Sequence, residues 1–273
     1  MLKLFYITNN PQIAKIAESA GVDRIFVDME YIGKELRQPK DMDTVKNHHT
    51  VEDVRNIRQA ITKAKLLVRV NPIHDDSKEE IEQVISAGAD VIMLPYWKTP
   101  DEVNEFLDYV AGRTKTLLLL ETDEAAKCVD KVISNGGFDE IYIGLNDLKI
   151  SQGKTFLFEL VTDGTVDELV AKFKANGLKF GFGGVGKVSD DNILSAKNIL
   201  TEHYRLGSSM VILSRAFCDT SKTSDLTEIE KSFRQGVKDN KDYEQMLSTQ
   251  NKQFFSDKHA ETAQIINQIV SSQ

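Results

Sequence analysis

The stretch Leu117-Leu118-Leu119-Leu120-Glu121-Thr122 decides the fold that the sequence predicts. Its leucine run is too short for a buried helix and ends in a carboxylate, as a buried parallel strand does where it surfaces at an active face. A helical pattern with an acidic first turn follows and stops at Asn135-Gly136-Gly137. A second apolar run, Ile141-Tyr142-Ile143, then leads to Asp147. This order of strand, helix and strand predicts a parallel βαβ unit.

Glu121 and Asp147 follow the two strands of this unit and should therefore lie at the same edge of the sheet. Neighbouring strands lie roughly 4.8 Å apart. Two carboxylates at that separation can bind one small hard cation, and Mg²⁺ prefers such oxygen ligands. The pair is a candidate metal site.

Short apolar runs alternate with helical patterns over most of the chain, which indicates repeated βα units. Eight strands are expected, at Leu4–Thr8, Arg24–Glu30, Leu66–Asn71, Val91–Tyr96, Leu117–Glu121, Glu140–Gly144, Lys179–Gly183 and Met210–Ser214. The helical patterns include Pro11–Ala20, Val51–Thr62, Ser77–Ala87 and Pro100–Ala111. Eight units in about 220 residues predict an α/β fold, the (β/α)₈ barrel, whose active site lies at the carboxyl ends of the strands. The strand count argues against the alternative, a doubly wound sheet.

Two segments exceed what a minimal barrel needs. The connection Tyr31–Thr50 is long and polar, and it is either a functional lid or an insertion. Its basic residues are Lys34, Arg37, Lys40, Lys46, His48 and His49. The tail contains two amphipathic patterns, Leu226–Met246 and Phe254–Val270. We therefore expect a barrel domain over residues 1–218 and C-terminal helices over 219–273 that close the barrel and contact a neighbouring subunit.

Composition excludes several classes of function. The chain carries 34 Lys and Arg against 42 Asp and Glu, a net charge of −8, and no basic stripe that could follow a phosphate backbone, so nucleic acid is not an expected partner. No apolar run approaches the roughly 18 residues of a membrane span, and no secretory signal pattern is present. Cys128 and Cys218 are too few for a disulfide framework or a Cys-rich zinc site. A cytoplasmic protein is expected.

Polar residues follow several of the expected strands. They are Asp28, Glu30, Arg69, Asn71, Glu121, Asn146 and Asp147. Packing does not explain them, because a buried charge without a partner costs several kcal/mol. They form either a reactive site or a structural ion network in which Arg69 pairs with Asp28 or Glu30.

Five motifs resemble the HpcH/HpaI aldolase and citrate lyase β-subunit family, in order over most of residues 20–220. They are Phe26-Val27-Asp28-Met29-Glu30, Leu67-Val68-Arg69-Val70, Val91-Ile92-Met93-Leu94-Pro95, Leu120-Glu121-Thr122 and Ile143-Gly144-Leu145-Asn146-Asp147-Leu148. The resemblance implies a (β/α)₈ barrel in which Glu121 and Asp147 bind Mg²⁺, Mn²⁺ or another divalent cation. It also implies that Arg69 holds the keto oxygen of the substrate. A divalent ion and a guanidinium beside a 2-oxo acid would stabilise the enolate formed when a C–C bond breaks.

Two positions depart from the family pattern. Tyr31 stands where these aldolases usually have a proton-transferring His, and Leu119 stands where they usually have Gln. A phenol has a pKa near 10 and is a poor base at neutral pH. Proton transfer could instead use His49 or His48, folded over the site from the long connection, or a metal-bound water relayed through Asp28 or Glu30.

The run Gly181-Phe182-Gly183-Gly184-Val185-Gly186 matches G-x-G-x-x-G in letters only. It falls at the seventh strand instead of opening a first βαβ unit, so we do not interpret it as a dinucleotide site. We expect Gly183 and Gly184 to let the backbone approach the substrate closely. Loops after strands seven and eight of such barrels often bind phosphate, which leaves a phosphorylated substrate open.

The sequence thus predicts a metal-dependent carbon–carbon lyase or aldolase that acts on a 2-oxo acid resembling pyruvate, with an aldehyde or acyl co-substrate. Asp28 and Glu30 would orient waters or neighbouring groups, and Asn146 would contact the ligand at its rim. The alternatives are a citrate-lyase-like cleavage of an acyl thioester and a binding protein that keeps the site without turnover. The family and the tail also predict a homo-oligomer, a trimer or a hexamer.

Overall fold

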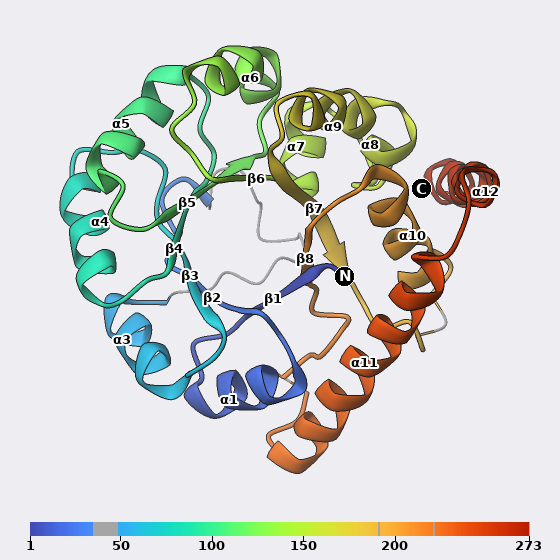
Figure 1. Ribbon diagram of the computed structural model, residues 1–273, viewed down its shortest axis with the longest axis horizontal. Coiled ribbons are helices and arrows are strands. Elements are labelled where there is room, and N and C mark those ends of the chain that lie inside the picture. The colour runs from blue at the N-terminus through green and yellow to red at the C-terminus, as the bar shows by residue number, and fades with distance from the viewer. Residues whose placement is uncertain (35–48, 191, 221, 273) are drawn as a thin grey trace.

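A computed structural model describes residues 1–34, 49–190, 192–220 and 222–272. It contains a closed barrel of parallel strands in the order β1 to β8, as Figure 1 shows. The strands are β1 Lys3–Ile7, β2 Arg24–Asp28, β3 Lys65–Arg69, β4 Val91–Leu94, β5 Lys115–Leu120, β6 Glu140–Ile143, β7 Lys179–Val185 and β8 Met210–Leu213. The predicted (β/α)₈ barrel is confirmed, and each expected strand agrees with an observed one to within a few residues.

Helices surround the barrel and cover its outer face (Figure 1). They are α1 Pro11–Ala20, α3 Val51–Ala60, α4 Ser77–Ser86, α5 Pro100–Val110, α6 Asp123–Asn135, α9 Thr165–Ala175 and α10 Ala196–Leu206, with two short helices, α7 Leu145–Ser151 and α8 Glu159–Thr162, after β6. Local sequence explains their starts. Asn10 caps α1 ahead of Pro11, and Thr99 forms a capping box with Glu102 ahead of Pro100.

Apolar side chains fill the barrel on both sides of the sheet. The interior holds a small cluster that includes Phe5, Phe26, Leu119 and Tyr142, and a larger cluster packs between the strands and the helices. At the amino-terminal end of the strands, Arg24 on β2 pairs with Glu140 on β6 at 2.8 Å (Nη2 to Oε1), and both are almost fully buried. An ion pair and apolar side chains therefore fill the barrel at the amino-terminal end of the strands.

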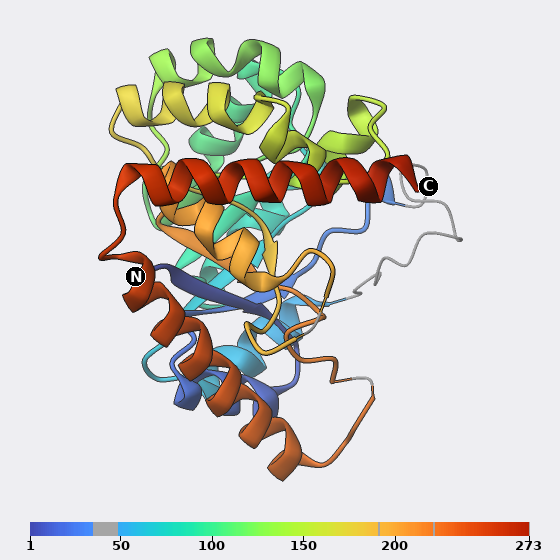
Figure 2. The same cartoon turned by 90° about the vertical axis from the view of Figure 1, so that its right-hand side faces the viewer.

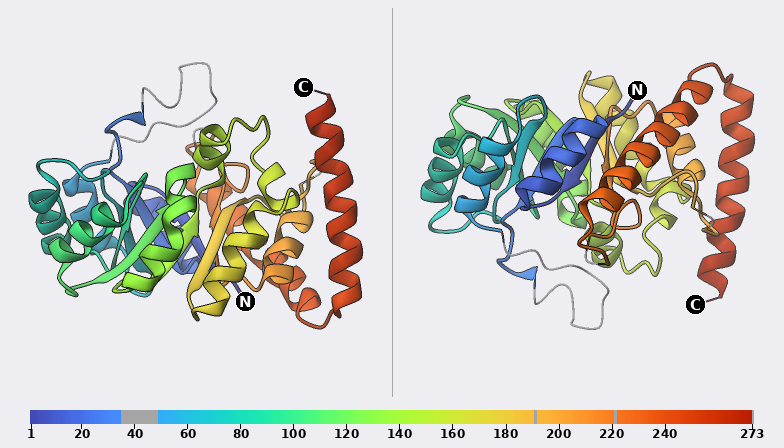
Figure 3. Two further views of the ribbon diagram at one scale, coloured as in Figure 1. Left: turned by 90° about the horizontal axis from the view of Figure 1, so that it is seen from above. Right: turned by 90° about the horizontal axis from the view of Figure 1, so that it is seen from below.

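The C-terminal region forms two long helices, α11 Leu226–Leu247 and α12 Lys252–Ser271, close to the predicted segments. Helix α11 packs against α1 and α10 and takes the place of the last barrel helix. Helix α12 lies outside this ring against α10 and α8, as the side view in Figure 2 and the two views in Figure 3 show. Its predicted contact with a neighbouring subunit stays a prediction.

Within the described ranges, no helix is both long enough and apolar enough to cross a bilayer. Several basic residues of the long connection after β2, Arg37, Lys40, Lys46 and His48, fall outside the described residues. Lys34 and His49, at its two ends, fall inside them.

Candidate active site

A cavity of about 660 Å³ opens at the carboxyl ends of the strands. Its polar lining residues include Asp28, Lys34, Arg69, Asn146 and Asp147. Its apolar lining residues include Ile7, Leu157, Phe158, Ile199 and Ile212. The predicted residues Asp28, Arg69, Asn146 and Asp147 therefore meet at the end of the barrel where enzymes of this fold carry their sites, whereas Glu30 and Glu121 are not among the lining residues.

Asp28 and Arg69 end neighbouring strands and lie side by side in the β2–β3 register. The guanidinium binds the carboxylate through two bonds, from Nε to Oδ1 and from Nη2 to Oδ2, both 2.7 Å. Burial alone would raise the pKa of Asp28, but its ion pairs with Arg69 and Lys34 outweigh burial and hold that pKa far below its usual range. Burial would likewise lower the pKa of Arg69, whereas Asp28 and Glu30 raise it well above its usual value. Both groups are charged at neutral pH.

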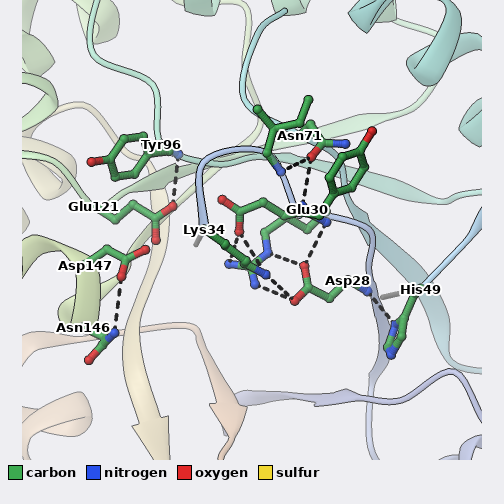
Figure 4. A network of polar contacts seen from close by, with 12 residues as sticks. Asp28, Glu30, Lys34, His49, Asn71, Tyr96, Glu121, Asn146 and Asp147 are labelled. Atoms are coloured by element: carbon green, nitrogen blue, oxygen red, sulfur yellow. Dashed lines mark hydrogen bonds and ion pairs between the residues drawn. The ribbon is translucent and has the colours of Figure 1, made fainter. Parts of the chain in front are cut away.

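Lys34 completes this cluster, which we call the charge ring: Asp28, Glu30, Lys34 and Arg69. The Lys34 Nζ lies 2.9 Å from Asp28 Oδ2 and 3.3 Å from Glu30 Oε2. Arg69 reaches the same two oxygens, with Nη2 at 2.7 Å and Nη1 at 3.2 Å. Each carboxylate thus bridges both cations (Figure 4).

The pairing of Arg69 with Asp28 and Glu30 is the ion network that the sequence offered as its second interpretation. The network and the cavity coincide, because three ring members also line the cavity. Sequence reasoning did not place Lys34 in the site. The one signal for it was its spacing of four residues from Glu30, which puts both on one side of a helical turn.

Glu121 and Asp147 come from the ends of β5 and β6. Glu121 directly follows β5 and is 3% exposed, and Asp147 lies in the first turn of α7 and is 7% exposed. The backbone N–H of Tyr96 donates to Glu121 Oε1 at 3.0 Å, and the side-chain amide of Asn146 donates to Asp147 Oδ1 at 3.3 Å. In Figure 4 the two carboxylates point toward one another.

Gly144 sets the approach of these two groups. A Cβ atom at this position would lie 2.7 Å from Glu121 Oε2 and 2.8 Å from Glu121 Cβ, so only glycine leaves the carboxylate its place. The Gly144 N–H also donates to Leu120 O at 2.9 Å, which carries the β5–β6 pairing up to the metal-site candidates.

The residues present fit a hard divalent cation. Two buried carboxylates are held by neutral donors, and Mg²⁺ commonly takes one or two carboxylates and completes its shell with water and substrate. The described ranges contain no group of three or more His, Cys, Asp or Glu side chains arranged to bind a metal. The set therefore suits an ion that shares its shell with a ligand and does not suit an all-protein cage.

The residues proposed for proton transfer lie in different surroundings. The Tyr31 side chain is 58% exposed, and its backbone N–H donates to Asn71 Oδ1 at 2.9 Å. His49 Nδ1 accepts the backbone N–H of Asp28 at 3.0 Å, and burial lowers the His49 pKa. That bond holds the ring of His49 against the backbone of Asp28 (Figure 4). The side chains of Tyr31 and His49 are not among the residues that line the cavity.

The two glycines at the end of β7 that were expected near the substrate also lie in different surroundings. Gly184 lines the cavity, whereas Gly183 has a left-handed φ of 56° and its carbonyl accepts the hydroxyl of Tyr142 at 2.6 Å. The register between β7 and β8 shifts between Gly181 and Gly184, so the sheet is irregular at this point. The backbone therefore approaches the cavity at Gly184.

The fold and site together define a class: a (β/α)₈-barrel protein whose mouth combines paired carboxylates with a bound guanidinium. The chain belongs to the HpcH/HpaI aldolase/citrate lyase family, whose sequence model matches residues 2–158. Membership supports an enzyme of the lyase or aldolase type. None of the curated proteins compared with the chain matches it.

Solved structures of similar fold include two proteins described as members of this family. An HpcH/HpaI aldolase from Desulfitobacterium hafniense DCB-2 is 15% identical, with a TM-score of 0.61 over 84% of this chain and 93% of that one. A family protein from Burkholderia cenocepacia J2315 is 16% identical, with a TM-score of 0.61 over 84% and 95%. The citrate synthase SbnG is 16% identical, with a TM-score of 0.60 over 84% and 92%. At these identities the likeness concerns the fold.

Proposed function

We propose that this protein is a divalent-metal-dependent carbon–carbon lyase or aldolase that acts on a 2-oxo acid through its enolate. One observation carries the proposal: Arg69, Asp147 and Asn146 line a single cavity, and Glu121 is close enough to Arg69 to raise the pKa of its guanidinium. A cation-binding carboxylate pair and a guanidinium are the two groups that an enolate oxygen requires.

Arg69 is preorganised for this role. Two of its five N–H groups donate to Asp28, and Nη1 forms an ion pair with Glu30 Oε2 at 3.2 Å; together these contacts fix the plane of the guanidinium. Its other N–H groups lie on the two terminal nitrogens and can donate to an anionic ligand. Because the charge ring contains two cations and two anions, its net charge is zero and it does not repel a carboxylate substrate.

The carboxylates of Glu121 and Asp147 would hold Mg²⁺ or Mn²⁺, which would polarise the ketone and carboxylate oxygens of the bound 2-oxo acid. Asn146 orients Asp147 and lies at the rim of the cavity. The cavity is of a size that holds ligands much larger than pyruvate, which leaves room for an aldehyde or acyl co-substrate beside it. We propose a trimer or hexamer acting in the cytoplasm.

The test uses pyruvate in D₂O with Mg²⁺. The wild-type protein should exchange the methyl protons of pyruvate for deuterium, as followed by ¹H NMR, because reversible enolisation passes through the proposed intermediate. Binding of pyruvate or oxalate without exchange would instead indicate a binding protein. Displacement of pyruvate by coenzyme A would favour the thioester lyase.

Glu121→Gln tests the metal site separately. The variant should bind Mn²⁺ at least about tenfold more weakly, since even changes to groups around a metal ligand cost that much. Titration followed by electron paramagnetic resonance measures this affinity. The control is Glu124→Gln, a nearby exposed carboxylate paired with Lys98 at 3.9 Å, which should leave Mn²⁺ affinity unchanged. Equal affinities for wild type and Glu121→Gln would remove Glu121 from the site.

A further inference from the structure

Lys34 is a lysine buried against the reaction site and held in a fixed place. Its side chain is only 7% exposed, yet it lines the cavity. Its Nζ donates to Asp28 Oδ2 at 2.9 Å and forms an ion pair with Glu30 Oε2 at 3.3 Å, and no further acceptor for it is found among the described residues. Asp28 Oδ2 accepts from both Lys34 and Arg69, so the ammonium and the guanidinium meet at this one oxygen.

The other candidate donors are poorly placed. Tyr31 is largely exposed, His49 is bound to the backbone of Asp28, and neither side chain lines the cavity. Tyr6 lines the cavity, but its hydroxyl donates to Cys218 O at 3.0 Å and burial raises its pKa to about 12. Arg69 keeps its protons at any physiological pH. Of these side chains, Lys34 is the one that both lines the cavity and carries a proton it can transfer.

We infer that Lys34 is the proton donor of this site, in a chain that has Tyr31 where similar aldolases usually have a histidine. The inference rests on the proposed function, since it concerns the same enolate. The Nζ–H bond of the ammonium breaks and its proton forms a new C–H bond with the enolate carbon. The electron pair of the enolate C=C makes that bond, and the enolate oxygen beside Arg69 becomes the ketone oxygen.

The charge ring explains how Lys34 returns to its starting state. After donation the amine is neutral, and Asp28 and Glu30 are left with Arg69 as their only cation of the ring. The excess negative charge favours reprotonation of Nζ by water at the mouth of the cavity. By microscopic reversibility the same nitrogen takes the methyl proton when pyruvate is enolised, so Lys34 should control the deuterium exchange rate.

Lys34→Arg separates proton transfer from charge. The arginine keeps the positive charge that Asp28 and Glu30 need, but it cannot give up a proton at neutral pH. We expect Lys34→Arg to bind oxalate, an enolate-like dianion, within about threefold of wild type by titration calorimetry. At saturating pyruvate its exchange rate should fall by about 100-fold or more, the usual contribution of general acid–base catalysis.

Lys34→Ala provides a second test in case Lys34→Arg folds poorly. Adding n-butylammonium to Lys34→Ala should restore part of the exchange, whereas n-butylguanidinium, which supplies the same charge without a transferable proton, should not. The matched control is Lys154→Arg, a lysine paired with Asp163 at 2.8 Å on the same side of the barrel, which should exchange like wild type.

Each outcome decides the inference. If Lys34→Arg exchanges at the wild-type rate, or if both additives restore Lys34→Ala equally, Lys34 supplies charge alone and the inference fails while the proposed function stands. If wild type binds oxalate but never exchanges pyruvate protons, the proposed function fails and the proton-donor role fails with it. Loss of exchange in Lys34→Arg with oxalate binding retained supports both.

Discussion

Asp28 and Glu30 are almost completely buried carboxylates, and each touches two cations. Removing one partner from such a cluster leaves another charge buried without compensation, which costs about 3–5 kcal/mol in comparable cases. The site therefore keeps its charges in place through mutual pairing, and it does so at the rigid ends of β2 and β3. A mobile guanidinium or ammonium would not be aimed at a ligand.

His203 is a buried residue whose ionisation should limit stability in mild acid. It lies on α10 with its ring stacked on Phe182 at a centroid distance of 3.9 Å, and neither ring nitrogen has a hydrogen-bond partner within the described structure. Burial lowers its pKa to about 3. In the unfolded chain a histidine titrates near 6.5.

Below about pH 6.5 this histidine is therefore protonated in the unfolded state but stays neutral in the folded state. The free energy of unfolding then falls by up to about 1.4 kcal/mol per pH unit until the pH approaches 3. His203→Phe keeps the stacked ring but removes this titration. We predict that the variant loses less unfolding free energy than wild type between pH 7 and pH 5, as measured by urea denaturation. Parallel pH profiles for the two proteins would contradict this account of His203.

At the scale of elements, α11 supports the glycine-containing end of β7. Its residue Asn240 is fully buried; the side-chain Oδ1 accepts the N–H of Val188 at 3.0 Å, and Nδ2 donates to Gly186 O at 3.1 Å. Gly186 lines the cavity. A helix far along the sequence thus binds backbone groups of the loop that follows β7.

Asn240→Leu should remove both bonds at nearly constant volume. We expect the unfolding free energy to fall by about 1–3 kcal/mol, because two partly buried backbone groups lose their partner. Oxalate affinity should fall as well, since the loop that carries Gly186 loses its anchor. The control on the same helix is the exposed Gln235→Leu, expected within about 0.5 kcal/mol of wild type. If Asn240→Leu is destabilised but binds oxalate with unchanged affinity, α11 does not support ligand binding at the site.

At the scale of the whole molecule, two C-terminal helices have different tasks. Helix α11 is held to the start of the chain by Glu244, which accepts the Leu2 N–H at 2.7 Å. Helix α12 has only Thr262 and Ile266 fully buried. Ile265, Ile269 and Val270 remain half-buried and are outside the described core.

This surface makes the predicted trimer or hexamer testable. Sedimentation velocity at micromolar concentration should show such an assembly for wild type. Ile269→Glu should shift it toward smaller species, because a charge would enter an apolar contact, whereas Gln268→Glu, at an exposed neighbouring position, should not. A monomeric wild type would show that the oligomer prediction was wrong.

The sequence by itself determined the barrel. Apolar runs such as Leu117-Leu118-Leu119-Leu120 form buried parallel strands, and the helices between them begin at local caps, so strand number and order could be predicted without tertiary contacts. Because parallel strands bring their carboxyl ends to one face, the convergence of Glu121, Asp147 and Arg69 was also predictable.

Only the tertiary structure decided how the charges pair and which proton carriers face the cavity. Lys34 is placed by its ion pairs with Asp28 and Glu30, and no periodic pattern encodes such a contact. The side chain of Tyr31, three residues earlier, is exposed to solvent, and the ring of His49 is bound to the backbone of Asp28. Side-chain direction in an irregular loop is set by packing and ion pairing across the fold, whereas the strands and helices follow from neighbours in the sequence.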